Sequence, residues 1–230
     1  MVIRNFPNLD TLTDAAAEAV ADSLRAAVAA RGEFVLALAG GSTPRPLYER
    51  LAAAPYRHLP WDRVHFFWGD ERCVPPDHLD SNYRLAAEAL LAHLDLRPEQ
   101  IHRLPGELAP PAGAAQAEAE LRAFFADREP RDGSPVFDLI LLGAGPDGHT
   151  ASLFPGRPAL EETQRWVVAE DHPGRPPLVP RLTLTLPVLN AARAVLFLVA
   201  GVEKRPVVEH PERYPAGRVQ GADVTWLVTP

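Results

Sequence analysis

The chain has 230 residues, 47% hydrophobic and 23% charged, which is the balance of an ordinary globular protein. This length predicts a single domain over residues 1–230. One cysteine, Cys73, excludes a disulfide framework and a cysteine-rich zinc module. The net charge of −7, with basic residues spread along the chain, argues against a nucleic-acid partner.

No targeting or membrane segment is visible in the sequence. The longest apolar stretches, such as residues 194–201, are strand-sized and fall well short of the roughly 20 residues that cross a bilayer. We therefore expect a cytoplasmic protein with no membrane partner.

Apolar periodicity and short apolar runs predict alternating helices and strands. The expected helices, in chain order, are residues 14–31, 45–54, 82–93, 113–127 and 187–192. The expected strands are residues 34–39, 64–68, 137–142, 166–169, 181–186, 194–199 and 225–228. Thr11 and Asp14 resemble a capping box at the first helix, and the alternation in residues 181–186 predicts a strand with one exposed face. Buried strands alternating with helices predict a Rossmann-like α/β fold, with a mainly parallel sheet and helices on both faces.

Three unusual segments directly follow predicted strands. Ligands bind beyond the carboxyl ends of the strands in an open parallel sheet. We therefore expect the segments to converge on one edge of the sheet. They are residues 40–45 (GGSTPR), 69–72 (GDER) and 143–150 (GAGPDGHT).

The first segment is typical of an anion site at the start of a helix. Gly40 and Gly41 allow a close backbone approach, and Ser42 and Thr43 add hydroxyl donors. A capped helix start without a ligand explains the same residues. The spacing of a nucleotide P-loop is absent.

The second segment brings two carboxylates and a guanidinium to a strand end. Arg72 can grip a phosphate in bidentate fashion, with Asp70 or Glu71 orienting it or contacting substrate hydroxyls. A solvated loop with local ion pairs is the structural alternative.

The third segment is the most informative of the three. Asp147 and His149 lie two residues apart in a glycine-rich turn, where a carboxylate can fix the histidine tautomer and make it a general base. A structural loop histidine is the alternative, but the other seven histidines have no comparable setting. No metal motif and no G-x-S-x-G nucleophile elbow is present, and Cys73 is better explained as a small buried residue than as an activated thiol.

Taken together and in this order, these segments resemble the 6-phosphogluconolactonase family. The matching stretches extend over nearly the whole chain: GGSTP (40–44), WGDERCVP (68–75), SNYRLA (81–86), GAGPDGHTASLFPG (143–156), PRLTLTLPVLN (180–190) and GVEKRPVV (201–208). The resemblance implies hydrolysis of 6-phospho-D-glucono-1,5-lactone to 6-phosphogluconate in the oxidative pentose phosphate pathway, without a metal or organic cofactor.

The resemblance also implies a role for each site residue. His149 would activate water against the lactone carbonyl, with Asp147 orienting it and the N–H of Gly148 facing the substrate. The phosphate and sugar hydroxyls would be held by residues of the first two segments and by two later cations, namely Gly40, Gly41, Ser42, Thr43, Asp70, Arg72, Arg181 and Lys204, the last of which is the only lysine in the chain.

Two other functions are alternatives to the lactonase. Related glucosamine-6-phosphate deaminases carry a glutamate five residues after the histidine, where this chain has Phe154, and a tyrosine where it has Arg72. A catalytically silent sugar-phosphate sensor would carry a DNA-binding domain, for which the chain has no room. Pro146, directly before Asp147, departs from the family pattern and stiffens the turn. We expect a monomer whose small-molecule partner is a phosphorylated sugar lactone.

Overall fold

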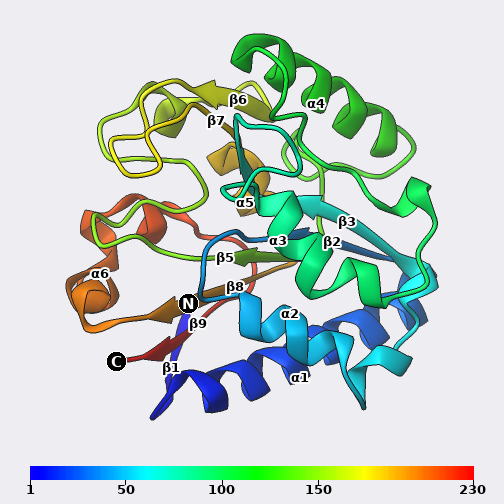
Figure 1. Cartoon of the computed structure of the whole chain (residues 1–230). Helices are drawn as coiled ribbons and strands as arrows, with labels where there is room; N and C mark the ends of the chain where they lie inside the picture. The colour runs from blue at the N-terminus through cyan, green and yellow to red at the C-terminus, as the bar shows by residue number, and fades with distance from the viewer.

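The computed structural model describes all 230 residues and contains a six-stranded parallel sheet flanked by helices (Figure 1). The strand order is β1-β9-β8-β5-β2-β3, and every neighbouring pair is parallel. The strands are β1 (Val2–Asn5), β2 (Phe34–Leu38), β3 (Val64–Trp68), β5 (Leu139–Leu142), β8 (Ala194–Ala200) and β9 (Val224–Thr229). The predicted α/β fold with a mainly parallel sheet is confirmed.

Helices cover the sheet because its central strands are apolar on both faces. All residues of β2 and β5 are buried. The helices are α1 (Leu9–Arg31), α2 (Arg45–Ala52), α3 (Asn82–Ala89), α4 (Pro110–Phe124), α5 (Leu186–Ala191) and α6 (Arg205–Glu209). The longest, α1, packs against α2 and against strands β2, β8 and β9. No helix is both long enough and apolar enough to span a membrane.

The start of α1 corrects one prediction. The helix begins at Leu9, five residues earlier than expected, and its N-cap is Asn8. The Asn8 side chain accepts a hydrogen bond from the Thr11 amide at 3.0 Å. Thr11 and Asp14 therefore form no capping box. Asparagine is as good a cap as threonine, and its earlier position lengthens the helix.

A second, antiparallel sheet has the order β4-β7-β6. Its strands are β4 (Asp70–Arg72), β6 (Val167–Glu170) and β7 (Arg181–Leu184). Only Gly69 separates β3 from β4, so the chain passes directly from the large sheet into the small one. The expected exposed face of residues 181–186 is wrong: every residue of β7 is buried, because β7 is the central strand and α4 packs against it.

The topology places a crevice between β2 and β5. The chain leaves β2 toward β3 at one edge of the sheet, whereas β5 is followed by β8 on the other side. Strand order therefore reverses between β2 and β5. Ligands bind at such switch points, beyond the carboxyl ends of the strands.

Candidate active site

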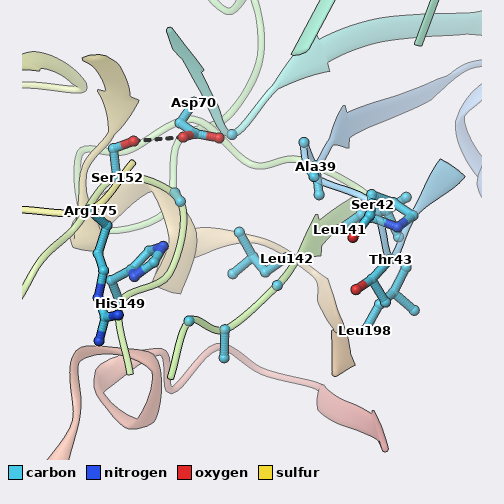
Figure 2. A pocket seen from close by; sticks show the side chains of 18 of the residues that line it. Ala39, Ser42, Thr43, Asp70, Leu141, Leu142, His149, Ser152, Arg175 and Leu198 are labelled. Carbon is cyan, nitrogen blue, oxygen red and sulfur yellow. Dashed lines mark hydrogen bonds between the residues drawn. The ribbon is translucent and has the colours of Figure 1, made fainter. Parts of the chain in front are cut away.

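A cavity of about 260 Å³ lies at this switch point, beyond the carboxyl ends of β2, β3 and β5. All three segments that follow these strands contribute to its lining, so their predicted convergence is confirmed. The sequence-predicted residues that line the cavity are Gly40, Gly41, Ser42, Thr43, Asp70, Arg72, His149, Arg181 and Lys204. Figure 2 shows His149 on the left of the cavity and Ser42 and Thr43 on the right, with Asp70 at the top of the view.

Asp147 and His149 form a hydrogen-bonded pair. The distance from Asp147 Oδ1 to His149 Nδ1 is 2.6 Å. Burial raises the pKa of Asp147, but the hydrogen bonds and charge of His149 and the charge of Arg175 outweigh it, so the pKa is below its ordinary value. An ionised carboxylate only accepts hydrogen bonds. His149 Nδ1 therefore donates, and in the neutral form of the ring the lone pair is then on Nε2.

Two glycines of the turn that carries Asp147 and His149 are required by close packing. A Cβ on Gly145 would lie 2.2 Å from the His149 ring, and one on Gly148, which has φ +75°, would lie 2.4 Å from Tyr214. Gly148 itself does not line the cavity, and its N–H donates to the Gly145 carbonyl at 2.9 Å. The prediction that this N–H faces the substrate is therefore wrong, because the N–H is already hydrogen-bonded within the turn.

The 40–43 loop leaves several backbone donors free. The N–H groups of Gly41, Ser42 and Thr43 donate to no acceptor in the protein, and they directly precede α2. A Cβ on Gly40 would lie 1.8 Å from Asn82 Oδ1, so only glycine fits against this side chain. Free amides at a helix N-terminus make an anion site.

Asp70 holds side chains from two other parts of the chain, Ser152 after β5 and Asn82 at the start of α3. This buried carboxylate accepts from Ser152 Oγ at 2.6 Å, which Figure 2 shows, and from Asn82 Nδ2 at 3.1 Å. Asp70 therefore fixes the cavity wall as well as lining it.

Glu71 points away from the cavity and caps α3. Its carboxylate accepts from the amides of Arg72, Asn82 and Tyr83 at 2.7–2.8 Å and from the Ser81 hydroxyl at 3.0 Å. Burial raises the pKa of Glu71, although these backbone hydrogen bonds oppose the shift. Residues 70–72 therefore form a packed strand, β4, and the alternative of a solvated loop is wrong.

Arg72 and Arg181 lie directly opposite each other on β4 and β7. Arg72 Nη1 donates to the Asp80 carbonyl and Arg181 Nη2 to the Pro177 carbonyl, both at 2.7 Å. The Nε atom of each is buried and has no partner. Burial lowers the pKa of Arg181, with the charge of Asp70 opposing the shift and that of Arg72 adding to it. Like charges opposite each other are unfavourable unless negative charge offsets them, so this pair is suited to binding an anion in addition to the nearby Asp70.

Burial shifts the pKa of Lys204 and of Cys73. Lys204 lines the cavity, and burial lowers its pKa despite the charge of Glu203. Burial raises the pKa of Cys73 to about 11, which disfavours a thiolate there. No group of three or more His, Cys, Asp or Glu side chains is placed to hold a metal ion.

Sequence reasoning missed three polar residues of the site. Arg175 lines the cavity and contacts Asp147 Oδ2 through Nε at 3.3 Å. Ser152 and Asn82 hold Asp70. Ser152 and Asn82 belong to stretches that resemble the family, but no pattern in the sequence predicts that both contact Asp70.

Comparison with known proteins identifies the family. Residues 7–226 match the family described as glucosamine-6-phosphate isomerases/6-phosphogluconolactonase. A 6-phosphogluconolactonase from Synechocystis is 43% identical over 96% of this chain and 92% of its own. One from Mycobacterium tuberculosis is 39% identical over 98% of this chain and 94% of its own.

Solved structures agree with this assignment. The 6-phosphogluconolactonase from Thermotoga maritima has a TM-score of 0.86 at 33% identity, over 100% of this chain and 99% of its own. That from Trypanosoma cruzi has a TM-score of 0.88 at 30% identity, over 99% and 94% of the two chains. A monomeric glucosamine-6-phosphate deaminase, at 22% identity and a TM-score of 0.79, shares the fold. The chain therefore belongs to the glucosamine-6-phosphate isomerase/6-phosphogluconolactonase family and is a hydrolase of its 6-phosphogluconolactonase branch.

Proposed function

We propose that this chain hydrolyses 6-phospho-D-glucono-1,5-lactone to 6-phospho-D-gluconate, a reaction of the oxidative pentose phosphate pathway, with His149 as the base. The observation that carries the proposal is that the facing pair Arg72 and Arg181 lines one cavity with His149, whose ring is hydrogen-bonded to Asp147. An anion site and a base in one cavity suit a phosphorylated substrate that needs water activated.

Phosphate binding anchors the substrate. Arg72, Arg181 and the free amides and hydroxyls of the 40–43 loop hold the phosphate, while Asp70 and Lys204 take part in binding the sugar hydroxyls. Anchoring at the phosphate orients the lactone carbonyl for attack, so binding energy remote from the reacting atoms contributes to the rate.

The reaction then needs one base. His149 Nε2 takes a proton from water as the water oxygen bonds to C1, and the carbonyl electron pair moves onto oxygen. When this pair returns, the bond from C1 to the ring oxygen breaks and His149 gives its proton to that oxygen. The carboxylic acid formed loses its proton at neutral pH. Asp147 holds the required tautomer throughout and stabilises the imidazolium.

Release of 6-phosphogluconate from fresh lactone tests the proposal, measured with a coupled dehydrogenase as the excess over spontaneous hydrolysis. We expect a large excess for the wild type. In Arg72→Ala the KM should rise by about 10- to 100-fold with little change in kcat, since a hydrogen bond to a charged group contributes roughly 1.5–3 kcal/mol. Arg25→Ala, at an exposed arginine on α1, is the matched control.

Two results would contradict the proposal. An unchanged KM in Arg72→Ala would remove the arginine pair from phosphate binding. No excess from folded wild-type protein would overturn the lactonase, and ammonia release from an amino-sugar phosphate would then be measured.

A further inference from the structure

The loop between β6 and β7 brings Arg175 beside the proposed base. Arg175 Nε contacts Asp147 Oδ2 at 3.3 Å, and the other oxygen of the same carboxylate bonds His149 at 2.6 Å. One carboxylate thus contacts both the proposed base and Arg175, whose side chain is 45% exposed. Figure 2 shows the side chains of Arg175 and His149 on the same side of the cavity.

The terminal nitrogens of Arg175 are uncommitted. Neither Nη1 nor Nη2 makes a hydrogen bond or ion pair within the protein, although the residue lines the cavity. Arg72 and Arg181 differ, because each commits one terminal nitrogen to a backbone carbonyl. Arg175 therefore keeps the parallel donors of its guanidinium free for a ligand next to His149.

Attack by water on the lactone creates negative charge on the oxygens of C1, whereas the ring oxygen receives the proton of His149 when its bond to C1 breaks. The charge develops on the carbonyl oxygen as water attacks and remains on the carboxylate of the product. Two backbone donors of the neighbouring turn are already used, since the Gly145 N–H donates to the His149 carbonyl and the Gly148 N–H to the Gly145 carbonyl, both at 2.9 Å.

We propose that Arg175 is a catalytic residue whose terminal guanidinium nitrogens bind the C1 oxygens and stabilise the charge that forms there. The inference rests on the proposed function, which supplies C1 as the reacting atom. Asp147 has two tasks in this arrangement: one oxygen fixes the tautomer of His149 and the other fixes the direction of the guanidinium. Such preorganised donors lower the barrier because they need not reorient during the reaction.

Binding measurements test this without turnover. Titration calorimetry compares 6-phosphogluconate with glucitol 6-phosphate, which carries the same phosphate but an alcohol in place of the carboxylate. In Arg175→Ala we expect affinity for 6-phosphogluconate to fall by about 10- to 100-fold and affinity for glucitol 6-phosphate to change less than about threefold. Leu178→Ala, in the same loop at a residue 74% exposed, should leave both affinities unchanged. Equal losses for both ligands in Arg175→Ala, or no loss, would overturn the proposal.

Kinetics provide a second readout. The kcat of Arg175→Ala should fall by roughly 100-fold with KM within about threefold, in line with removal of an oxyanion donor. Arg175→Lys should retain part of the activity, and added guanidinium ion should restore part of it to Arg175→Ala but not to His149→Ala. A change in KM alone would overturn the proposal. A wild type that bound the two ligands differently but hydrolysed no lactone would instead contradict the proposed function, so the two failures are distinguishable.

Discussion

At the scale of single residues, the catalytic proposal depends on the environment of the His149 ring. Asp147 accepts from Nδ1 on one side, and the buried Phe154 ring lies with its centroid 4.5 Å from the imidazole centroid. These contacts hold the ring in place and leave Nε2 as its proton acceptor. Phe154 occupies the position where the related deaminases have a glutamate, so no second carboxylate stands next to the base.

Removing the imidazole should therefore affect chemistry far more than binding. In His149→Ala we expect kcat to fall by about 10²- to 10⁴-fold, the usual contribution of a general base. Affinity for 6-phosphogluconate, measured by calorimetry, should change little because the phosphate contacts remain. A parallel loss of affinity and kcat would contradict the role of His149 as a base.

At the scale of elements, the passage from β3 to β4 builds the arginine side of the site. The chain continues through Gly69 into the small sheet, where Asp70 faces the cavity and Glu71 turns the other way to cap α3. The alternating side-chain directions of a strand thus give two adjacent carboxylates different tasks.

Glu71→Gln tests this capping. Each carboxylate oxygen accepts two hydrogen bonds, and glutamine keeps only one such oxygen, so at least one backbone N–H would face an NH₂ group. We expect the free energy of unfolding, measured with urea at pH 7, to fall by about 2–4 kcal/mol. The control is Glu88→Gln, at an exposed glutamate of α3. This substitution should change the free energy of unfolding by less than about 0.5 kcal/mol. Equal stability of the two variants would exclude the capping role.

A histidine pair packs against β3. His65 Nδ1 lies 3.0 Å from His102 Nε2, and the His102 ring stacks on Phe67 with centroids 4.3 Å apart. Burial, followed by the charges of His65 and Arg128, lowers the pKa of His102 from 6.5 to about 4. Burial also lowers the pKa of His65, which Glu33 opposes and Arg128 and Arg97 reinforce. The folded protein therefore favours two neutral rings.

The sign of the pH effect follows from this. Between pH 6.5 and 4 the unfolded chain binds more protons than the folded one, so stability is complete above pH 6.5 and falls as the pH falls toward 4. In His102→Phe, which keeps a ring on Phe67, the urea midpoint should fall less between pH 7 and pH 4.5 than in the wild type. His210→Gln, at an exposed histidine, should behave like the wild type. An identical fall in His102→Phe and the wild type would show that this pair does not titrate on unfolding.

The sequence predicts the elements whose signal is local. The buried strands β2, β3, β5 and β8 are apolar runs, and the expected and observed bounds agree within two residues. The exposed edge strand β1, the charged three-residue strand β4 and the five-residue helix α6 carry no such signal and were not predicted. The burial of β7 likewise depends on α4 and two neighbouring strands, which no periodicity within residues 181–184 reveals.

The same distinction holds for the candidate site. The Asp147–His149 pair is predictable because both residues lie in one glycine-rich turn. Arg72 and Arg181 face each other because of the register between two strands that lie more than 100 residues apart in the sequence. The contact of Arg175 with Asp147 depends on the path of a proline-rich loop. Long-range pairing of this kind has no local signature, and only the family resemblance pointed to Arg181.

At the scale of the whole molecule, the two sheets share one core. A cluster of 58 buried residues includes Leu36, Leu141 and Phe197 of the large sheet and Leu182 and Val167 of the small one. The cavity is lined from both sheets as well, by His149 beyond β5 and by Arg72 and Arg181 on β4 and β7. We propose that residues 1–230 unfold as one domain, and that a ligand in the cavity stabilises both sheets together.

Scanning calorimetry with and without 6-phosphogluconate tests this. We expect one transition, with equal calorimetric and van't Hoff enthalpies. At a ligand concentration 100 times Kd, binding adds about 2.7 kcal/mol to the free energy of unfolding, which raises Tm by roughly 5–10 °C in a chain of this size. Arg181→Ala should lose most of that rise at the same concentration, because its affinity is lower. Two separate transitions, of which the ligand moved only one, would mean that the small sheet unfolds independently of the parallel sheet.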